Sequence, residues 1–156
     1  REALIKALNE GRIDVIATDH APHTAEEKQG TYFKAPAGLP LVQHAVQTLF
    51  DLVAMGHISL ELAVDRACHA SADLFGVTDR GYVREGWFAD LVLVDAEKPY
   101  RVSSDNVLYK CGWSPFEGHE FSSTIDTTIV NGQVVWTDGR LTGAIPGARL
   151  EFTRAR

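Results

Sequence analysis

Cysteine, net positive charge and long apolar runs are what this sequence has least of. Its two cysteines, Cys68 and Cys111, lie far apart and outside any Cys-x-x-Cys spacing. This arrangement favours free, buried thiols in a reducing cytoplasm over a disulfide. The net charge of −6 gives no electrostatic reason to expect nucleic acid or an anionic membrane as a partner. No apolar run approaches the length of a membrane span, so we predict no membrane partner.

The rest of the composition is that of an ordinary globular protein. Hydrophobic residues make up 45% and charged residues 23% of the 156 residues, which allows one sizeable core or two small ones. The first residues already read as the middle of a helix, because Leu4, Ile5 and Leu8 share one face. Asn9-Glu10-Gly11 is expected to end this helix. We therefore expect the chain to be the C-terminal piece of a longer protein.

A short apolar run, Ile13–Thr18, leads into Asp19–His23, which holds a carboxylate and two imidazoles. The run is rich in β-branched residues and does not alternate, which is typical of a strand inside a parallel sheet. Because ligands lie just beyond the carboxyl ends of such strands, this stretch is a predicted active site. Taken alone, Asp19 fits a metal ligand, a general base, a helix N-cap or an Asx turn. His20 and His23 alone form only a weak metal-binding pattern, and a single histidine is more often structural.

The next part of the chain predicts one long loop and several helices. Residues Thr24–Leu39 have no clear period and carry glycine and proline, so we expect a functional loop that is mobile without substrate. The apolar stripe of Leu41–Val53 predicts a helix that Gly56 follows. Ser59 is the expected N-cap of another helix, and Ser71–Gly76 predicts a further capped turn that ends at glycine.

The C-terminal half predicts strands and turns. Ala89–Asp95 is an apolar, β-rich run, and Ile125–Thr137 reads as a hairpin that turns at Asn131-Gly132. Asn-Gly between two β-rich runs is the strongest short hairpin signal. The chain is therefore predicted to divide into an α/β part, residues 1–76, and a small β module, residues 77–156.

Several of these stretches together resemble the amidohydrolase superfamily and, within it, the dihydroorotases. Asp19–His23 is similar to the signature at the end of that family's eighth barrel strand, and Ala35–Pro40 is similar to its Pro-x-Gly substrate loop. Lys110–Gly118 resembles the Trp-Ser/Thr-Pro-Phe-Glu-Gly stretch of one dihydroorotase branch. Gly86–Val92 and Thr128–Gly132 are similar to the β-sandwich that amidohydrolases build from their two chain ends.

The resemblance implies a fold and an activity. Residues 1–76 would be the C-terminal end of a metal-dependent (β/α)8 TIM barrel, with its last strand and helices, and residues 77–156 part of a small β-sandwich. The enzyme would be a zinc-dependent hydrolase of a cyclic amide that reversibly interconverts dihydroorotate and N-carbamoyl-aspartate in pyrimidine biosynthesis. Two zinc ions, a cytoplasmic homodimer and no partner besides the small-molecule substrate are expected of the full-length enzyme.

The resemblance also assigns roles to residues of this chain. Asp19 becomes a zinc-ligating carboxylate and the catalytic base, which passes a proton from the attacking water to the departing ring nitrogen. His23 would bind the free carboxylate of the substrate. The backbone of Ala37 and Gly38 would approach the ring, which Gly38 permits because it has no side chain. His20 has no catalytic role in the resemblance and is expected to support its neighbours.

The sequence departs from the family pattern in two places. Gln43-His44 stands where many relatives carry Glu-Thr, and His69–Ala72 stands where Asn-Pro-Ala is common. Both lie on predicted helices away from the reacting centre, so they weaken the assignment only slightly. Trp113 and Pro115-Phe116 are interpreted as packing at the junction between the barrel and the β module.

Most of the family's metal ligands are absent from this sequence. It has no His-x-His pair, and no lysine stands at a family-like position for a bridging carboxylated lysine. One metal ligand cannot hold a dinuclear centre, so the 156-residue chain alone is predicted to be inactive. The predicted strand Ile13–Thr18 is likewise expected to need neighbours on both sides that this chain does not supply.

Three other hypotheses remain. A sibling cyclic amidohydrolase, such as a hydantoinase or allantoinase, would not need the carboxylate-binding His23. A non-catalytic, dihydroorotase-like scaffold subunit would not need intact Asp19 and His23. An unrelated small α/β binding domain with a β appendage would leave four separate motif matches to coincidence.

Overall fold

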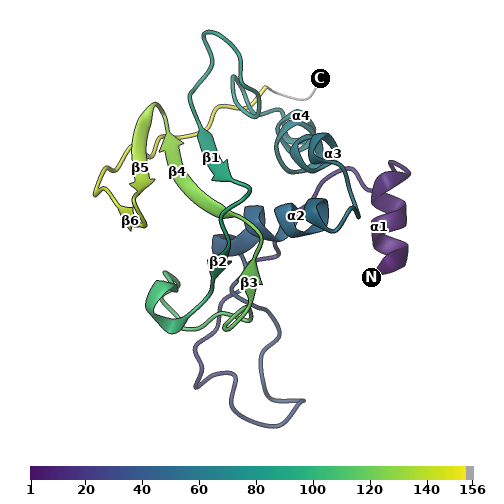
Figure 1. The fold of residues 1–156 in the computed structure, drawn as a ribbon, viewed down its shortest axis with the longest axis vertical. Helices are drawn as coiled ribbons and strands as arrows, with labels where there is room; N and C mark the ends of the chain where they lie inside the picture. Colours follow the sequence, from purple (N-terminus) through teal and green to yellow (C-terminus); the bar gives the residue numbers. More distant parts are fainter. Residues whose placement is uncertain (154–156) are drawn as a thin grey trace.

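The computed structural model describes residues 1–153, with helices on one side and an antiparallel sheet on the other (Figure 1). The helical elements are α1 (Glu2–Asn9), the 3₁₀ turn η1 (Val42–His44), α2 (Ala45–Ala54), α3 (Leu60–Val64), the π-helical turn η2 (Asp65–His69), α4 (Ala70–Phe75) and the 3₁₀ turn η3 (Ser104–Asn106). The strands are β1 (Leu91–Asp95), β2 (Tyr100–Arg101), β3 (Glu120–Phe121), β4 (Thr124–Val130), β5 (Gln133–Thr137) and β6 (Arg140–Leu141).

The helices begin and end close to the residues that the sequence indicates. The Ser59 side chain accepts a hydrogen bond from the Leu62 backbone N–H at 3.1 Å, as expected of the N-cap. Gly76 ends α4 in the left-handed conformation. The separate capped turn expected from Ser71 is wrong, because α3, η2 and α4 follow one another without a break. Ser71 lies inside this helical run, where its hydroxyl donates to the Arg66 carbonyl.

The sheet has the strand order β1-β4-β5-β6, with antiparallel neighbours throughout. The predicted strand Ala89–Asp95 and the hairpin Ile125–Thr137 are confirmed as β1 and as β4–β5. Asn131 and Gly132 both have positive φ, at 48° and 77°, which suits a two-residue hairpin turn. The short strands β2 and β3, which the sequence analysis did not predict, form a separate two-stranded sheet.

The predicted strand Ile13–Thr18 is wrong for the described part of this chain, where it is an extended segment in no sheet. A strand needs ladder partners, and the one backbone bond here runs from the Ile16 N–H to the Arg66 carbonyl at 3.1 Å. The segment is held by side chains instead, since Ile13 and Ile16 pack against the main apolar cluster. Residues 1–153 therefore show a mixed α/β fragment and no barrel.

The main core lies where α1, α2 and α3 meet. Leu8, Ile58 and Ala63 are its most buried members, and they are surrounded by partly buried aliphatic side chains from α1, α2 and the extended segment. A second buried pair, Val102 and Phe121, lies by the β2–β3 sheet. The core is small for a chain of this length, and many large apolar side chains outside it are exposed.

One expectation on burial needs correction. Both cysteines are free, but Cys68 is exposed and Cys111 half-buried, so the prediction of buried thiols is wrong. The α3–α4 run buries Ala63 and Ala72 rather than Cys68. In the η1–α2 region, the most buried side chains are the polar ones of His44 and Gln47.

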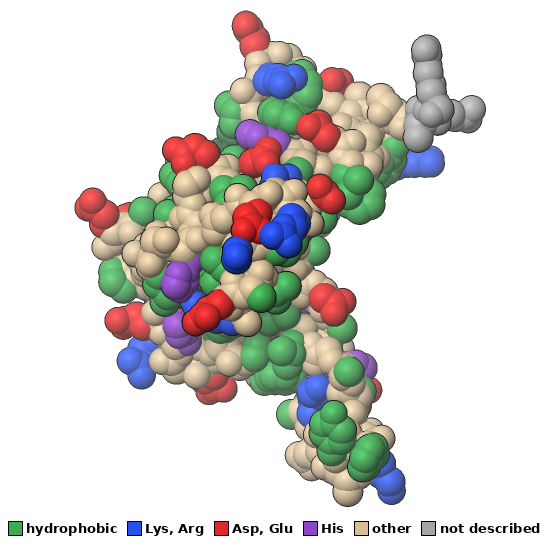
Figure 2. Space-filling view, turned by 90° about the vertical axis from the view of Figure 1, so that its right-hand side faces the viewer, with side chains coloured by type: hydrophobic (Ala, Val, Ile, Leu, Met, Phe, Trp, Pro, Cys, Tyr) green, Lys and Arg blue, Asp and Glu red, His purple; other side chains and the backbone are tan. Residues whose placement is uncertain are grey.

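The predicted loop Thr24–Leu39 contains no helix and no strand ladder, and it projects from the lower end of the molecule in Figure 1. In Figure 2 the lower end is a narrow arm with hydrophobic side chains on its surface. Tyr32 and Phe33 in this loop are 90% and 93% exposed. None of the described helices is long and apolar enough to cross a membrane.

Candidate active site

Asp19 stands at the end of the extended segment with its side chain exposed. Its φ of 48° is left-handed, a conformation that aspartate tolerates better than most residues do. The carboxylate has no hydrogen bond or ion pair to any residue between 1 and 153. Both oxygens are therefore available to accept a proton or to ligate a cation.

His20 fixes the start of this site to the end of the long loop. It forms an isolated parallel bridge with Leu39, and its Nδ1 accepts from the backbone N–H groups of Leu41 and Val42 at 3.0 and 3.3 Å. Its ring lies against Tyr109, with 5.4 Å between the centroids. Nδ1 is therefore an acceptor and carries no proton. These contacts fit the supporting role expected of His20.

Gly38 lies directly against the segment that follows Asp19. Its φ is 103°, and a Cβ added there would lie 2.6 Å from the Ala21 carbonyl oxygen and 2.7 Å from the Ala21 Cβ. A glycine is thus required at this position, because a side chain would meet Ala21. Ala37 beside it is exposed.

His23 is half-buried and has two anchors. Its carbonyl accepts from the indole N–H of Trp113 at 2.8 Å, so Trp113 holds this backbone in addition to packing. The imidazole Nδ1 lies 3.4 Å from a carboxylate oxygen of Glu27. The other ring nitrogen, Nε2, has no ion-pair or hydrogen-bond partner among the described residues.

Two residues of the site were missed by the sequence analysis. Glu27 accepts from the Thr24 backbone N–H at 2.9 Å, while the Thr24 hydroxyl accepts from the Glu27 backbone N–H at 3.2 Å. The Thr24 N–H lowers the pKa of Glu27 most, burial raises it, and His23 lowers it further. Lys28 donates to the carbonyls of Pro36 and Gly38. The Thr-x-x-Glu spacing of a capping box was the available signal for Glu27.

A cavity of about 450 Å³ opens beside these residues, between the start of the long loop and the segment that contains Tyr109. Asp19 directly precedes His20, which lines this cavity, but Asp19 itself does not line it. Burial raises the pKa of Tyr109 most, against hydrogen bonding by Gln43. The lining residues are His20, Pro22, Thr24, Glu27, Leu108, Tyr109, Lys110 and Cys111.

No metal centre is complete in this part of the protein. Between residues 1 and 153 there is no group of three or more histidine, cysteine, aspartate or glutamate side chains that could hold a metal ion. A carboxylate oxygen is an ordinary zinc ligand, and the unpaired Asp19 carboxylate fits as one such ligand. A structural zinc site takes four ligands and a catalytic one three from the protein, so this chain supplies a fraction of either.

Gln43-His44 joins α2 to the β module. The Gln43 side chain accepts from the Leu108 N–H at 2.8 Å and donates to the Asn106 carbonyl at 2.7 Å. His44 is fully buried, with its ring stacked on Phe121 at 5.5 Å. Burial, and then repulsion from His119, lowers the pKa of His44 to about 4. The two residues that depart from the family pattern are thus structural here.

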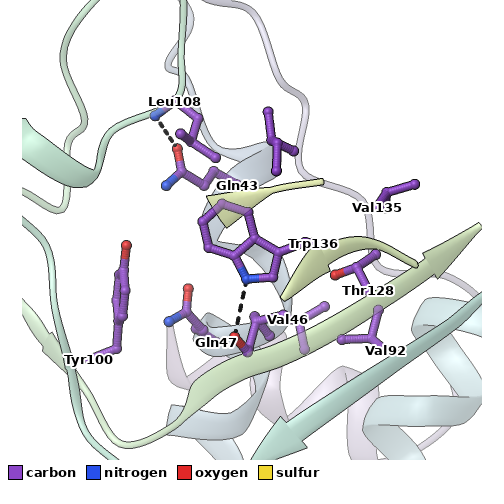
Figure 3. Close-up of a pocket in the computed structure, with 11 residues that line it drawn as sticks. Gln43, Val46, Gln47, Val92, Tyr100, Leu108, Thr128, Val135 and Trp136 are labelled. Carbon is purple, nitrogen blue, oxygen red and sulfur yellow. Dashed lines mark hydrogen bonds between the residues drawn. The ribbon is translucent and has the colours of Figure 1, made fainter. Parts of the chain in front are cut away.

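A second cavity, of about 290 Å³, lies between Gln43 and Gln47 on one side and the sheet on the other (Figure 3). Figure 3 shows the Trp136 indole in this space, with its N–H bonded to a backbone carbonyl, which is that of Ile125 at 3.3 Å. Its lining is mostly apolar and contains no acid, base or thiol except the Tyr100 hydroxyl. This cavity therefore offers little for acid–base or metal chemistry.

The sequence of this chain matches the amidohydrolase family over residues 1–135. It is 42% identical to the dihydroorotase of Halobacterium salinarum over 150 residues, which are 96% of this chain and 35% of that protein. It is 36% identical to the dihydroorotase of Clostridium acetobutylicum over 139 residues, or 88% of this chain and 32% of that protein. The chain thus spans about a third of the length of these curated relatives.

Solved structures of similar fold include hydantoinases. A D-hydantoinase (dihydropyrimidinase) from Thermus sp. matches 92% of this chain and 32% of its own, with a TM-score of 0.82 and 29% identity. An L-hydantoinase (dihydropyrimidinase) from Arthrobacter aurescens matches 88% of this chain and 32% of its own, with a TM-score of 0.80 and 30% identity. The chain belongs to the amidohydrolase family.

Proposed function

We propose that this amidohydrolase-family chain forms the C-terminal third of a zinc-dependent dihydroorotase of pyrimidine biosynthesis. The enzyme would reversibly interconvert dihydroorotate and N-carbamoyl-aspartate. The observation that carries the proposal is the Asp19 carboxylate, which is exposed and has no partner among residues 1–153. Asp19 opens the Asp19–His23 motif, directly after the apolar segment Ile13–Thr18. The dihydroorotases that this chain resembles at 42% and 36% identity support the choice of substrate.

In this proposal the chain contributes one zinc ligand, Asp19. Zinc, when bound, lowers the pKa of water and polarises the amide carbonyl. The remaining ligands and the rest of the barrel are expected from the other two thirds of the full-length enzyme. The 156-residue chain alone is proposed to be inactive for this reason. A cytoplasmic homodimer and the division at residues 76 and 77 stay predictions.

Each proposed site residue of this chain has a separate task. Asp19 accepts the proton of the attacking water and hands it to the departing ring nitrogen, and it does the reverse when carbamoyl-aspartate closes. His23 binds the free carboxylate of the substrate through Nε2, the ring nitrogen that Glu27 leaves unoccupied. The exposed Ala37 and the neighbouring Gly38 offer backbone to the substrate ring.

A hydantoinase is the second candidate, because solved structures of similar fold include hydantoinases. His23 and its Glu27 partner argue against it, since a hydantoin ring carries no free carboxylate for His23 to bind. Direct assay with dihydroorotate, hydantoin and allantoin separates these activities.

The test is dihydroorotate hydrolysis and zinc content of the full-length protein that contains this chain. Asp19→Ala should lower kcat by about 10³-fold or more, because it removes both a base and a ligand. Asp14→Ala is the matched control, since Asp14 is exposed on the same segment, and it should stay near wild-type activity. An inactive wild type with little zinc would favour the scaffold hypothesis instead.

A further inference from the structure

We propose that the turn Thr24–Lys28 is the positioning element of the substrate site: Glu27 orients His23, and Lys28 presents the backbone of Ala37 to the substrate. This inference rests on the proposed function, because it assigns a purpose to the groups that would bind dihydroorotate. The two adjacent side chains act on two different parts of the site, which lie ten or more residues apart in the sequence.

Lys28 holds the substrate loop by its two carbonyls. Its Nζ lies 2.7 Å from the Pro36 oxygen and 3.0 Å from the Gly38 oxygen, in a half-buried position. Hydrogen bonds from an ammonium are about twice as strong as neutral ones. Lys28 has no carboxylate within ion-pairing distance in the described part of the chain. Its charge is therefore directed at the loop backbone.

This arrangement decides where the Ala37 N–H points. The described peptide bonds are all trans, so the Ala37 N–H lies opposite to the Pro36 carbonyl. Because that carbonyl is turned toward Lys28, the Ala37 N–H is turned away from it. The Ala37 N–H has no acceptor among residues 1–153. It is thus an oriented, unused donor for a carbonyl or carboxylate oxygen of a ligand.

Glu27 orients the imidazole ring of His23. Its carboxylate is held by the Thr24 N–H at 2.9 Å and lies 3.4 Å from the His23 Nδ1. Nδ1 and Nε2 lie on different edges of the imidazole ring, so engaging Nδ1 leaves Nε2 to face a ligand. In metal sites, a carboxylate beside one ring nitrogen commonly fixes the orientation of a histidine. Glu27 is placed to act on the His23 ring in the same way.

The turn itself is fixed before any ligand binds. The Lys28 N–H bonds to the Thr24 carbonyl at 3.1 Å, and Thr24 and Glu27 bond reciprocally. The backbone from which the Glu27 and Lys28 side chains project is therefore held in one position. Preorganised donors lower the entropic cost of binding, so their loss should raise KM more than it lowers kcat.

The experiment uses steady-state kinetics of the full-length protein with dihydroorotate. Lys28→Met should raise KM about tenfold, and Glu27→Gln about fivefold, with kcat within about threefold of wild type. Lys34→Met and Glu26→Gln are the matched controls, because both side chains are exposed on the same loop and make no described side-chain bond. Lys28→Arg, which keeps two donors for the carbonyls, should recover most of the lost affinity.

A second measurement follows hydrogen exchange of residues 31–42 in the absence of substrate. Lys28→Met should speed exchange there at least about threefold, while Lys34→Met should not. If wild type is active and the Lys28 and Glu27 variants match their controls, the positioning inference is overturned and the dihydroorotase proposal stands. A fall in kcat with zinc loss, rather than a rise in KM, would also overturn it.

An inactive wild type would overturn the proposed function, and with it the substrate part of this inference. The exchange experiment still decides whether Lys28 fixes the loop. Unchanged exchange in Lys28→Met would then overturn the inference completely.

Discussion

The segment from Ile13 to Leu39 and the junction between α2 and residues 100–124 both carry polar side chains, but they hold them differently. In the first, Asp19 is exposed and unbonded within residues 1–153. In the second, Asp51 accepts from the Ser122 N–H at 2.8 Å and from the His119 imidazole at 2.9 Å. The segment leaves the Asp19 carboxylate available to a ligand, whereas the junction pairs the Asp51 carboxylate within the protein.

The junction shows what the pairing of buried polar groups achieves, although His44 Nε2 and Ser123 Oγ have no partner in the described structure. Gln47 is 3% exposed and donates to the Ser123 carbonyl at 3.2 Å, and the Gln43 backbone N–H donates to the Tyr109 hydroxyl at 2.8 Å. Paired polar groups that leave water fix a single docking geometry, because any shift leaves a buried group unpaired. The site segment has no such constraint on Asp19, which is compatible with the proton-transfer role proposed for it.

The largest expected effect concerns His44, the junction residue with an unsatisfied atom. Its Nε2 is buried without a partner in the described structure, and its pKa is lowered to about 4. The unfolded chain binds this proton near pH 6.5, so stability should fall as pH drops from 6.5 to 4, by about 3 kcal/mol in all. Below that window both states are protonated and the loss stops.

His44→Phe tests this by removing the titrating group and keeping a stacked ring. The fall in the thermal unfolding midpoint of the full-length protein between pH 7 and 4 should be smaller in His44→Phe than in wild type. His57→Phe, the same change at an exposed histidine, should leave the wild-type pH dependence intact. An unaltered pH dependence in His44→Phe would show that the junction tolerates a buried imidazolium.

Asp51→Ala should give the next largest loss. It leaves the Ser122 N–H without its acceptor and removes the His119 contact, which should cost about 2 kcal/mol of stability. Burial raises the pKa of Asp51, but the Ser122 and His119 hydrogen bonds outweigh this and lower it. The stabilisation should therefore be complete above about pH 4 and disappear as pH falls further.

Unfolding of wild type and Asp51→Ala at pH 7 and pH 3 measures both parts of this prediction. Asp126→Ala is the control, because Asp126 is exposed and bonds only to the adjacent Thr127 hydroxyl in the described structure. Equal stability losses in the two variants at pH 7 would contradict the idea that the junction gains more from its carboxylate than the surface does.

The smallest effect is expected in the site segment. Gly38→Ala should destabilise the protein by about 1 kcal/mol more than Gly30→Ala, because only at Gly38 does the new Cβ meet the Ala21 backbone. Both glycines have positive φ, 140° at Gly30 and 103° at Gly38, so alanine is strained at both positions and the contact with Ala21 is what differs most. Thermal unfolding of the two variants measures the difference. Equal losses would mean that the loop moves away from Ala21 without cost.

Several local signals in the sequence predicted local structure correctly. Ser59 caps α3, Gly76 ends α4 and Asn131-Gly132 turns the hairpin, since each of these depends on a few neighbouring residues. Membership in the amidohydrolase family was also readable from short motifs. Asp19 was placed correctly at the end of an apolar segment, although that segment is not a strand in this chain.

Contacts between distant residues were not predictable in the same way. The apolar pattern of Ile13–Thr18 indicated a strand, but a ladder requires partners that no pattern within the run can supply. No local pattern pairs Lys28 with the carbonyls of Pro36 and Gly38, and only the path of the loop brings them to its ammonium. His44 was expected on a helix away from the reacting centre, and no local pattern indicated that it is fully buried.

The sequence by itself determined the caps, the turns, the hairpin and the position of the Asp19–His23 motif, because these depend on backbone preferences and spacings within a few residues. The tertiary structure alone decided that Glu27 meets His23, that Trp113 holds the His23 backbone, and that polar residues fill the α2 junction. These pairings depend on how loops close and how surfaces meet. Many sequences of the same local pattern would close differently, so the pairings appear only when the whole chain has folded.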